Sequence, residues 1–292
     1  MTDEQVLRPG TPIGPALLAI GKDLLGAGTL DPQKPEALAI HSFRRRMKRW
    51  RAFLRLLEPI LGDEAVRLRT EARDLARTLA GARDAQAALD AVEDLGGDYA
   101  ALSVTSLATI KTRIENVRTT AEALTLTTAA RDKLRTALAK TSSDIEHWPV
   151  EDIDFRDIAA GLTEGYRRAR RAAPPDWSAV TAEDLHRLRQ CVVTHRYQME
   201  LIEPAWPRLS KVWVGEAQRL RERLGKHQDL AVLAKLMEPK AQLARWRGKL
   251  APVIEARQRD HIEAAMRYAG RLFAEKPQAF QSRIETMWEA ES

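Results

Sequence analysis

The chain has little of several residue types and patterns, and each shortage excludes a class of protein. Only one cysteine, Cys191, stands among 292 residues, so no disulfide can form within the chain. We expect Cys191 to be a small buried hydrophobic residue in a protein of a reducing compartment. No run approaches the roughly 20 apolar residues that span a membrane. The N-terminus, MTDEQVLRPG, lacks the basic and apolar segments of a secretion signal. We therefore expect a cytoplasmic protein without a membrane partner.

Strand patterns are also missing, whereas the composition favours helices. Alanine, leucine and arginine are abundant, and aromatic residues make up 5% of the chain. Apolar residues recur at helical spacing between proline and glycine breaks, which predicts an all-α fold. The predicted helices span about 12–28, 36–58, 63–94, 99–122, 127–141, 153–172, 181–203, 207–237, 240–270 and 277 onward.

A charged phrase occurs twice, 145 positions apart. Residues 41–59 read HSFRRRMKRWRAFLRLLEP, and residues 186–204 read HRLRQCVVTHRYQMELIEP. Six of these nineteen positions are identical, where composition alone would give roughly one. Downstream, Leu79 and Asp84 recur as Leu224 and Asp229 at the same offset. The spacing predicts an internal duplication of a helical module.

The first copy of the phrase predicts a helix with one basic face. His41, Arg44, Lys48, Arg51 and Arg55 fall within a stripe roughly 80° wide at about 100° per residue, and the apolar residues take the opposite side. No acid occurs from 41 to 55, although like charges one turn apart repel. The pattern therefore predicts that an anion binds this face.

These motifs together resemble the CHAD family, the conserved histidine alpha-helical domain. The resemblance rests on H-x-x-R followed seven residues later by arginine in both copies, on the downstream leucine and aspartate, on YRRARR at 166–171, and on the ending RLFAEKPQAFQSRIETMW. It implies a single domain over 9–292 with pseudo-symmetric helical halves at 9–150 and 151–292. It further implies a basic cleft between the halves that binds inorganic polyphosphate. A protein with this function can associate with polyphosphate granules in the cytoplasm.

Site residues follow from the resemblance and from the repeat. The resemblance maps the basic set onto His41, Arg44, Lys48, Arg49 and Arg51 in half one, and onto His186, Arg189, Arg196 and Tyr197 in half two. Half two has Val193 and Thr194 in place of Lys48 and Arg49, so we expect it to contribute less. The basic stripe adds Arg55, and the repeat offset pairs Lys22 with Arg167. Arg167, Arg168, Arg170 and Arg171 span a helix turn, so at most two of them can face one ligand.

Several of these residues keep a second interpretation. The two histidines either contact the anion or cap the start of their helices. Asp84 and Asp229 are expected to pair with arginine or histidine of the basic helices rather than to act in catalysis or metal binding. Glu200 takes the place of Arg55 in half two, where it can orient a neighbouring arginine.

Two other functions compete with polyphosphate binding. A nucleic-acid binder would need aromatic side chains between the basic ones for base stacking, and the basic stripe has none. A phosphoryl-transfer or polyphosphate-hydrolysing enzyme would need a metal site or a G-x-x-x-x-G-K-[ST] loop, and the sequence contains no such loop. The sequence thus favours a binding protein that is not an enzyme and has no metal or cofactor.

Overall fold

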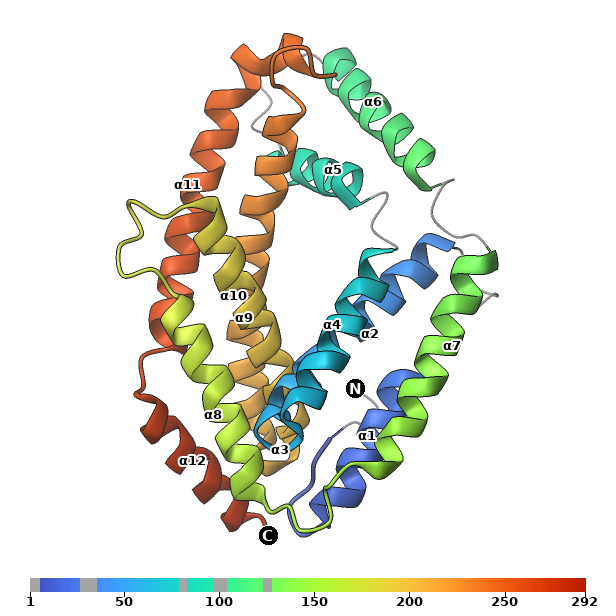
Figure 1. Cartoon of the computed structure of the whole chain (residues 1–292). Helices are drawn as coiled ribbons and strands as arrows, with labels where there is room; N and C mark the ends of the chain where they lie inside the picture. Colours follow the sequence, from blue (N-terminus) through green and yellow to red (C-terminus); the bar gives the residue numbers. More distant parts are fainter. Residues whose placement is uncertain (1–5, 27–35, 79–82, 97–103, 123–127) are drawn as a thin grey trace.

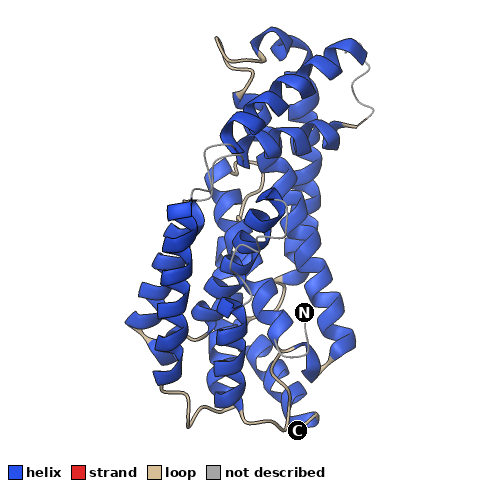
Figure 2. Ribbon diagram, turned by 90° about the vertical axis from the view of Figure 1, so that its right-hand side faces the viewer, coloured by secondary structure: helices blue, strands red, loops and turns tan. Residues whose placement is uncertain are grey.

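The computed structural model describes residues 6–26, 36–78, 83–96, 104–122 and 128–292. Every regular element within these ranges is helical, which confirms the predicted fold class (Figure 2). The helices are α1 (Ile13–Gly26), α2 (Glu36–Leu56), α3 (Glu58–Leu61), α4 (Asp63–Arg77), α5 (Arg83–Leu95), α6 (Val104–Glu122), α7 (Thr128–Asp144), α8 (Phe155–Ala172), α9 (Ala182–Leu201), α10 (Pro207–Lys235), α11 (Arg247–Leu272) and α12 (Pro277–Ala290).

Two hydrophobic cores hold the helices together, and both combine the two halves of the sequence. The larger core joins α1–α4 and α7 to α8, α9, α12 and parts of α10 and α11. The smaller core joins α5 and α6 to the end of α10 and the start of α11. Figure 1 shows α5 and α6 at the upper end of the molecule, away from α2 and α4. The long helices α10 and α11 therefore connect both cores.

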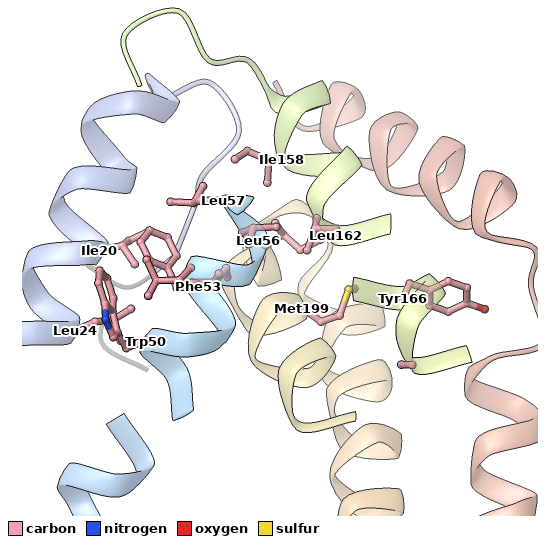
Figure 3. Packing of buried hydrophobic residues seen from close by; sticks show 14 of the residues in the cluster. Ile20, Leu24, Trp50, Phe53, Leu56, Leu57, Ile158, Leu162, Tyr166 and Met199 are labelled. Atoms are coloured by element: carbon pink, nitrogen blue, oxygen red, sulfur yellow. The ribbon is translucent and has the colours of Figure 1, made fainter. Parts of the chain in front are cut away.

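Helix α2 buries its apolar side in the larger core, as its periodicity predicts. Phe43, Met47, Trp50, Phe53 and Leu54 are each at most 2% exposed. Figure 3 shows Trp50 and Phe53 beside residues of α1, and the end of α2 beside α8. Burying this side fixes the rotation of α2 about its axis, so its basic side must face elsewhere.

Close backbone packing brings α8 and α9 against α2. A Cβ atom added to Gly161 of α8 would collide with the carbonyl oxygen of Leu56, so glycine permits this approach. From α9, the side-chain amide of Gln198 donates a hydrogen bond to the carbonyl oxygen of Ala52 at 3.2 Å. These contacts place the C-terminal end of α2 next to both second-half helices.

Two predicted helices differ from the structure. The continuous stretch predicted for 63–94 is two helices, α4 and α5, which pack against different partners, α2 and α10. The sequence between them contains Gly81, and glycine is a poor helix former. The helix predicted from 240 begins at Arg247, because Lys240 adopts a positive φ of 70° and the chain turns back there. Leu79, and hence the first leucine of the repeated downstream motif, lies outside the described residues.

Helix bounds elsewhere follow the repeat offset closely. Shifting α2 by 145 positions gives 181–201, and α9 spans Ala182–Leu201. The same shift takes α6 to 249–267, and α11 spans Arg247–Leu272. The superposition of the halves in space stays a prediction. Among the described residues, no helix combines the length and apolar character that crossing a membrane requires.

Candidate anion-binding site

The basic side of α2 faces a row of arginines on α4. Helix α4 packs along α2 after the short turn of α3, and it carries Arg69, Arg73 and Arg77 at four-residue spacing. Arg73, Arg69 and Arg77 are the charges that act most strongly on Arg51. Two helices therefore present arginines to the same space.

Arg55, one turn further along α2, lies close to the same row of α4 arginines and to an arginine of α8. The charges that act on it come from Arg69 of α4 and Arg168 of α8, with Glu58 opposing them. Arg168 is in reach because Gly161, two turns earlier on α8, packs against α2. We call Arg51, Arg55, Arg69, Arg73, Arg77 and Arg168 the arginine cluster.

The surroundings of Arg51 and Arg55 disfavour the charged forms of both side chains. Burial, followed by the repulsion of Arg73, Arg69 and Arg77, lowers the pKa of Arg51. Burial and the neighbouring arginines also lower the pKa of Arg55. Both side chains are half-buried, and neither has a hydrogen bond or an ion pair within the described part of the chain. Half-buried guanidinium groups that make no hydrogen bond or ion pair favour the approach of an anion.

Carboxylates bind the other members of the cluster instead. Glu58 accepts hydrogen bonds from Arg69 and from Nη1 of Arg168, the latter at 3.4 Å. Glu164 accepts one from Nε of Arg168 at 2.7 Å. Arg73 pairs with Asp74 at 3.1 Å. The carboxylates are therefore hydrogen-bonded to other arginines, and none of these bonds reaches Arg51 or Arg55.

Arg49 of the first copy and residues of the second copy form a separate group where α2 meets α9. Nη2 of Arg49 donates to Glu200 at 3.1 Å, and Arg196 donates to the other oxygen of the same carboxylate. The guanidinium groups of Arg196 and Arg49 lie 4.3 Å and 5.5 Å from the ring centre of Tyr197. Glu200 thus binds both arginines, and Tyr197 packs beneath them.

His186 and Arg189 lie on another part of α9, facing α10. Nδ1 of His186 is 3.4 Å from Oε1 of Gln228, and Arg189 donates to the same oxygen at 2.9 Å. Arg189 and Asp229 line a cavity of about 420 Å³ between α5, α9 and α10. Its other lining residues include three acids of α5, so the cavity has mixed charge. The acids are Asp90, Glu93 and Asp94.

Comparison with known proteins assigns a family to this arrangement. The family model of the CHAD domain matches residues 27–238. The chain belongs to the CHAD domain family. Its structure is similar to the crystal structure of the CHAD domain from the plant Ricinus communis, with 16% identity over 96% of this chain and 94% of that one and a TM-score of 0.54. It is also similar to PptA from Streptomyces chartreusis, with 17% identity over 96% of this chain and 100% of that one and a TM-score of 0.59. No curated protein sequence matches the chain.

Other residues that the CHAD resemblance or the repeat suggested are spread over the surface. His41 and Lys48 are exposed on α2, and Arg44 beside them is half-buried. Lys22 of α1 pairs with Glu146 at 2.9 Å. Asp84 is exposed in the first turn of α5, and no bond joins it to a described arginine or histidine.

The arginines of YRRARR, on α8 of this CHAD domain, point in different directions, as their helical spacing predicts. Arg168 joins the arginine cluster, and Arg167 binds Glu164 beside it. Nε of Arg170 donates to the carbonyl oxygen of Phe273 at 3.1 Å, which ties α8 to the end of α11. Of the predicted half-two cations, Arg168 is therefore the one that meets Arg55.

The α4 arginines were missing from the sequence-based site of this CHAD domain. Their signal was present as R-x-x-x-R-x-x-x-R in RLRTEARDLAR, a spacing that aligns Arg69, Arg73 and Arg77 along one face. Acidic residues between them, Glu71 and Asp74, obscure the stripe in a simple count of charges. Among the described residues, no group of three or more histidine, cysteine or acidic side chains is arranged to hold a metal ion.

Proposed function

We propose that this CHAD domain binds inorganic polyphosphate at the arginine cluster without consuming it. The observation that carries the proposal is the pair Arg51 and Arg55, which are half-buried among like charges and have no hydrogen bond or ion pair within the described residues. A guanidinium group can bind two phosphate oxygens with its planar fork and stays charged while doing so. These properties suit holding phosphate rather than transferring it.

The extent of the cluster favours a polymer over a single anion. Arg69 and Arg77 are eight residues apart on one helix, which corresponds to roughly 12 Å along its axis. Arg51 and Arg55, one turn apart on α2, add two more positive charges beside this row. A flexible chain with one charge per phosphate can neutralise this row and release counterions as it binds. The proposed ligand is a cytoplasmic polyphosphate, including that in granules.

Nucleic acid remains the competing ligand, and the aromatic residues of the two helices that carry the repeated phrase, α2 and α9, favour polyphosphate. Trp50 is stacked on Trp148 at 5.9 Å between ring centres and is buried in the core. Tyr197 is 8% exposed beneath Arg49 and Arg196. Neither ring is open for a base to stack on, whereas proteins that bind single strands use exposed rings.

A binding titration with a matched control tests the proposal. We expect the Arg51→Ala/Arg55→Ala variant, hereafter the α2 double variant, to bind fluorescent long-chain polyphosphate more weakly than wild type. Its slope of log affinity against log salt should be smaller by about 1.5, because each lost phosphate contact removes roughly 0.7–0.9. The control, Arg156→Ala/Arg267→Ala, removes two exposed arginines of α8 and α11 and the same total charge.

Each outcome of the titration has a defined meaning. Equal slopes for the α2 double variant and the control would exclude the cluster as the site. Single-stranded DNA that displaces polyphosphate at equal phosphate concentration would favour the nucleic-acid function. Orthophosphate released by the wild-type protein would establish an enzyme. Circular dichroism of all variants confirms that the fold is retained.

A further inference from the structure

Glu58 is an acidic residue at the inner end of the arginine cluster, where it contacts two of the cluster arginines. It is the first residue of α3, and its carboxylate lies between α4 and α8, where it accepts hydrogen bonds from Arg69 and Arg168. The negative charge of Glu58 also stabilises the charged form of Arg55 on α2. One carboxylate therefore interacts electrostatically with arginines from three helices.

This carboxylate stays ionised in its site. Burial opposes the charged form, but the hydrogen bond and charge of Arg69, with those of Arg168, outweigh burial and hold the pKa of Glu58 below its usual range. The backbone of Glu58 is fixed on both sides. The preceding Leu57 is fully buried, and the carbonyl oxygen of Glu58 accepts a hydrogen bond from the backbone N–H of Gly62 at 3.0 Å. Only a side-chain rotation can remove the carboxylate from the arginines.

The row of α4 arginines becomes steadily less accessible toward Glu58. The side chain of Arg77 is 72% exposed, that of Arg73 45%, and that of Arg69 15%. Glu58 itself is 27% exposed. An anion approaching from solvent therefore first meets Arg77 and Arg73, which pair with the exposed Asp74, and then Arg69, the least exposed arginine of the row, which pairs with Glu58.

We propose that Glu58 is an intramolecular competitor of the phosphate ligand. Its carboxylate holds the inner end of the arginine cluster, and a phosphate group binds Arg69 and Arg168 only after displacing it. This inference rests on the proposed function. A polymer can displace Glu58 because its other phosphates bind Arg51, Arg73 and Arg77 at the same time. Orthophosphate has no such additional contacts, so Glu58 makes the site selective for chains over single anions.

Neutralising the carboxylate tests this role. Glu58→Gln keeps the size of the side chain and removes its charge, and we expect it to bind long-chain polyphosphate roughly tenfold more tightly than wild type. Orthophosphate should compete with the fluorescent polymer at a lower concentration in this variant. The control is Glu263→Gln, which removes the same charge from an exposed position on α11 and should change affinity much less.

The outcomes separate this inference from the function on which it rests. A wild-type protein that does not bind polyphosphate refutes both. Wild-type binding with equal or weaker binding by folded Glu58→Gln refutes the competitor role alone. A structural clamp would predict a lower melting temperature together with lower affinity.

A second variant keeps the test decisive if Glu58→Gln does not fold. In the wild-type protein the carboxylate of Glu164 accepts hydrogen bonds from Nε of Arg168, at 2.7 Å, and from Arg167. Glu164→Gln removes the negative charge that holds both arginines. It should tighten binding as well, since it releases a cluster arginine from another carboxylate. Unchanged affinity in Glu164→Gln would then overturn the idea that these acids compete with phosphate.

Discussion

A buried histidine should make the fold sensitive to acid. His195 of α9 is fully buried, and its Nε2 accepts a hydrogen bond from Nε1 of Trp213 at 2.9 Å. Burial, together with the charge of Arg283, lowers its pKa from 6.5 to about 3. The folded protein therefore holds His195 neutral under conditions in which the unfolded chain protonates it.

The size of the effect follows from proton linkage. Between pH 6.5 and 3 the unfolded chain binds more protons at this residue, so stability falls as the pH falls through that window. For pKa values of 6.5 unfolded and about 3 folded, the loss between pH 7 and pH 5 is about 2 kcal/mol. This is a sizeable fraction of the 5–15 kcal/mol that is typical of domains.

Urea denaturation of wild type and His195→Gln at pH 7 and pH 5 measures this loss. Glutamine can still accept from Trp213 but does not titrate, so the variant should lose about 2 kcal/mol less than wild type over the same interval. His147→Gln, at an exposed position, serves as the control and should behave like wild type. Equal losses in wild type and His195→Gln would refute the reasoning.

Three further predictions concern the arginines. Arg189→Ala/Arg196→Ala should weaken polyphosphate binding less than the α2 double variant in the same titration, because Glu200 already neutralises Arg196. Saturating polyphosphate should slow alkylation of Cys191, which lies beside the cluster, and mass spectrometry of iodoacetamide-treated protein measures the rate. Arg51→Met should raise the free energy of unfolding by on the order of 1 kcal/mol at low salt, and less at physiological salt, since it removes repulsion at a half-buried site. Unchanged urea midpoints would contradict this last expectation.

Features set by local periodicity could be predicted from the sequence. The two faces of α2 follow from the spacing of its apolar residues, and the structure buries Phe43, Met47 and Trp50 as expected. Helix ends followed from proline and glycine breaks, as at α9, which was predicted to end before Pro204 and ends at Leu201. Such signals act within a turn or two of helix, so they are present in the sequence itself.

Features that depend on the partner of each helix could not be predicted. The basic stripe predicted that an anion binds α2, but it did not show that α4 would face it with Arg69 and Arg73. The offset suggested equivalent roles for Arg51 and Arg196, yet Arg196 is bound to Glu200 whereas Arg51 has no such counterion within the described residues. A pairing across 151 positions, such as Arg49 with Glu200, leaves no periodic signal in the sequence.

The proposed binding and the stability of the fold oppose each other at the arginine cluster, and the arrangement of acids accommodates both. Arg51 and Arg55 weaken the folded state because burial and repulsion disfavour their charged forms. The apolar face on the other side of α2 holds the helix in place nonetheless. Glu58 relieves repulsion at the inner end, where Arg69 is least exposed and water can screen it least. Placing more acids near Arg51 would stabilise the fold and remove the site, so the missing counterion at Arg51 is best explained as a position for a ligand.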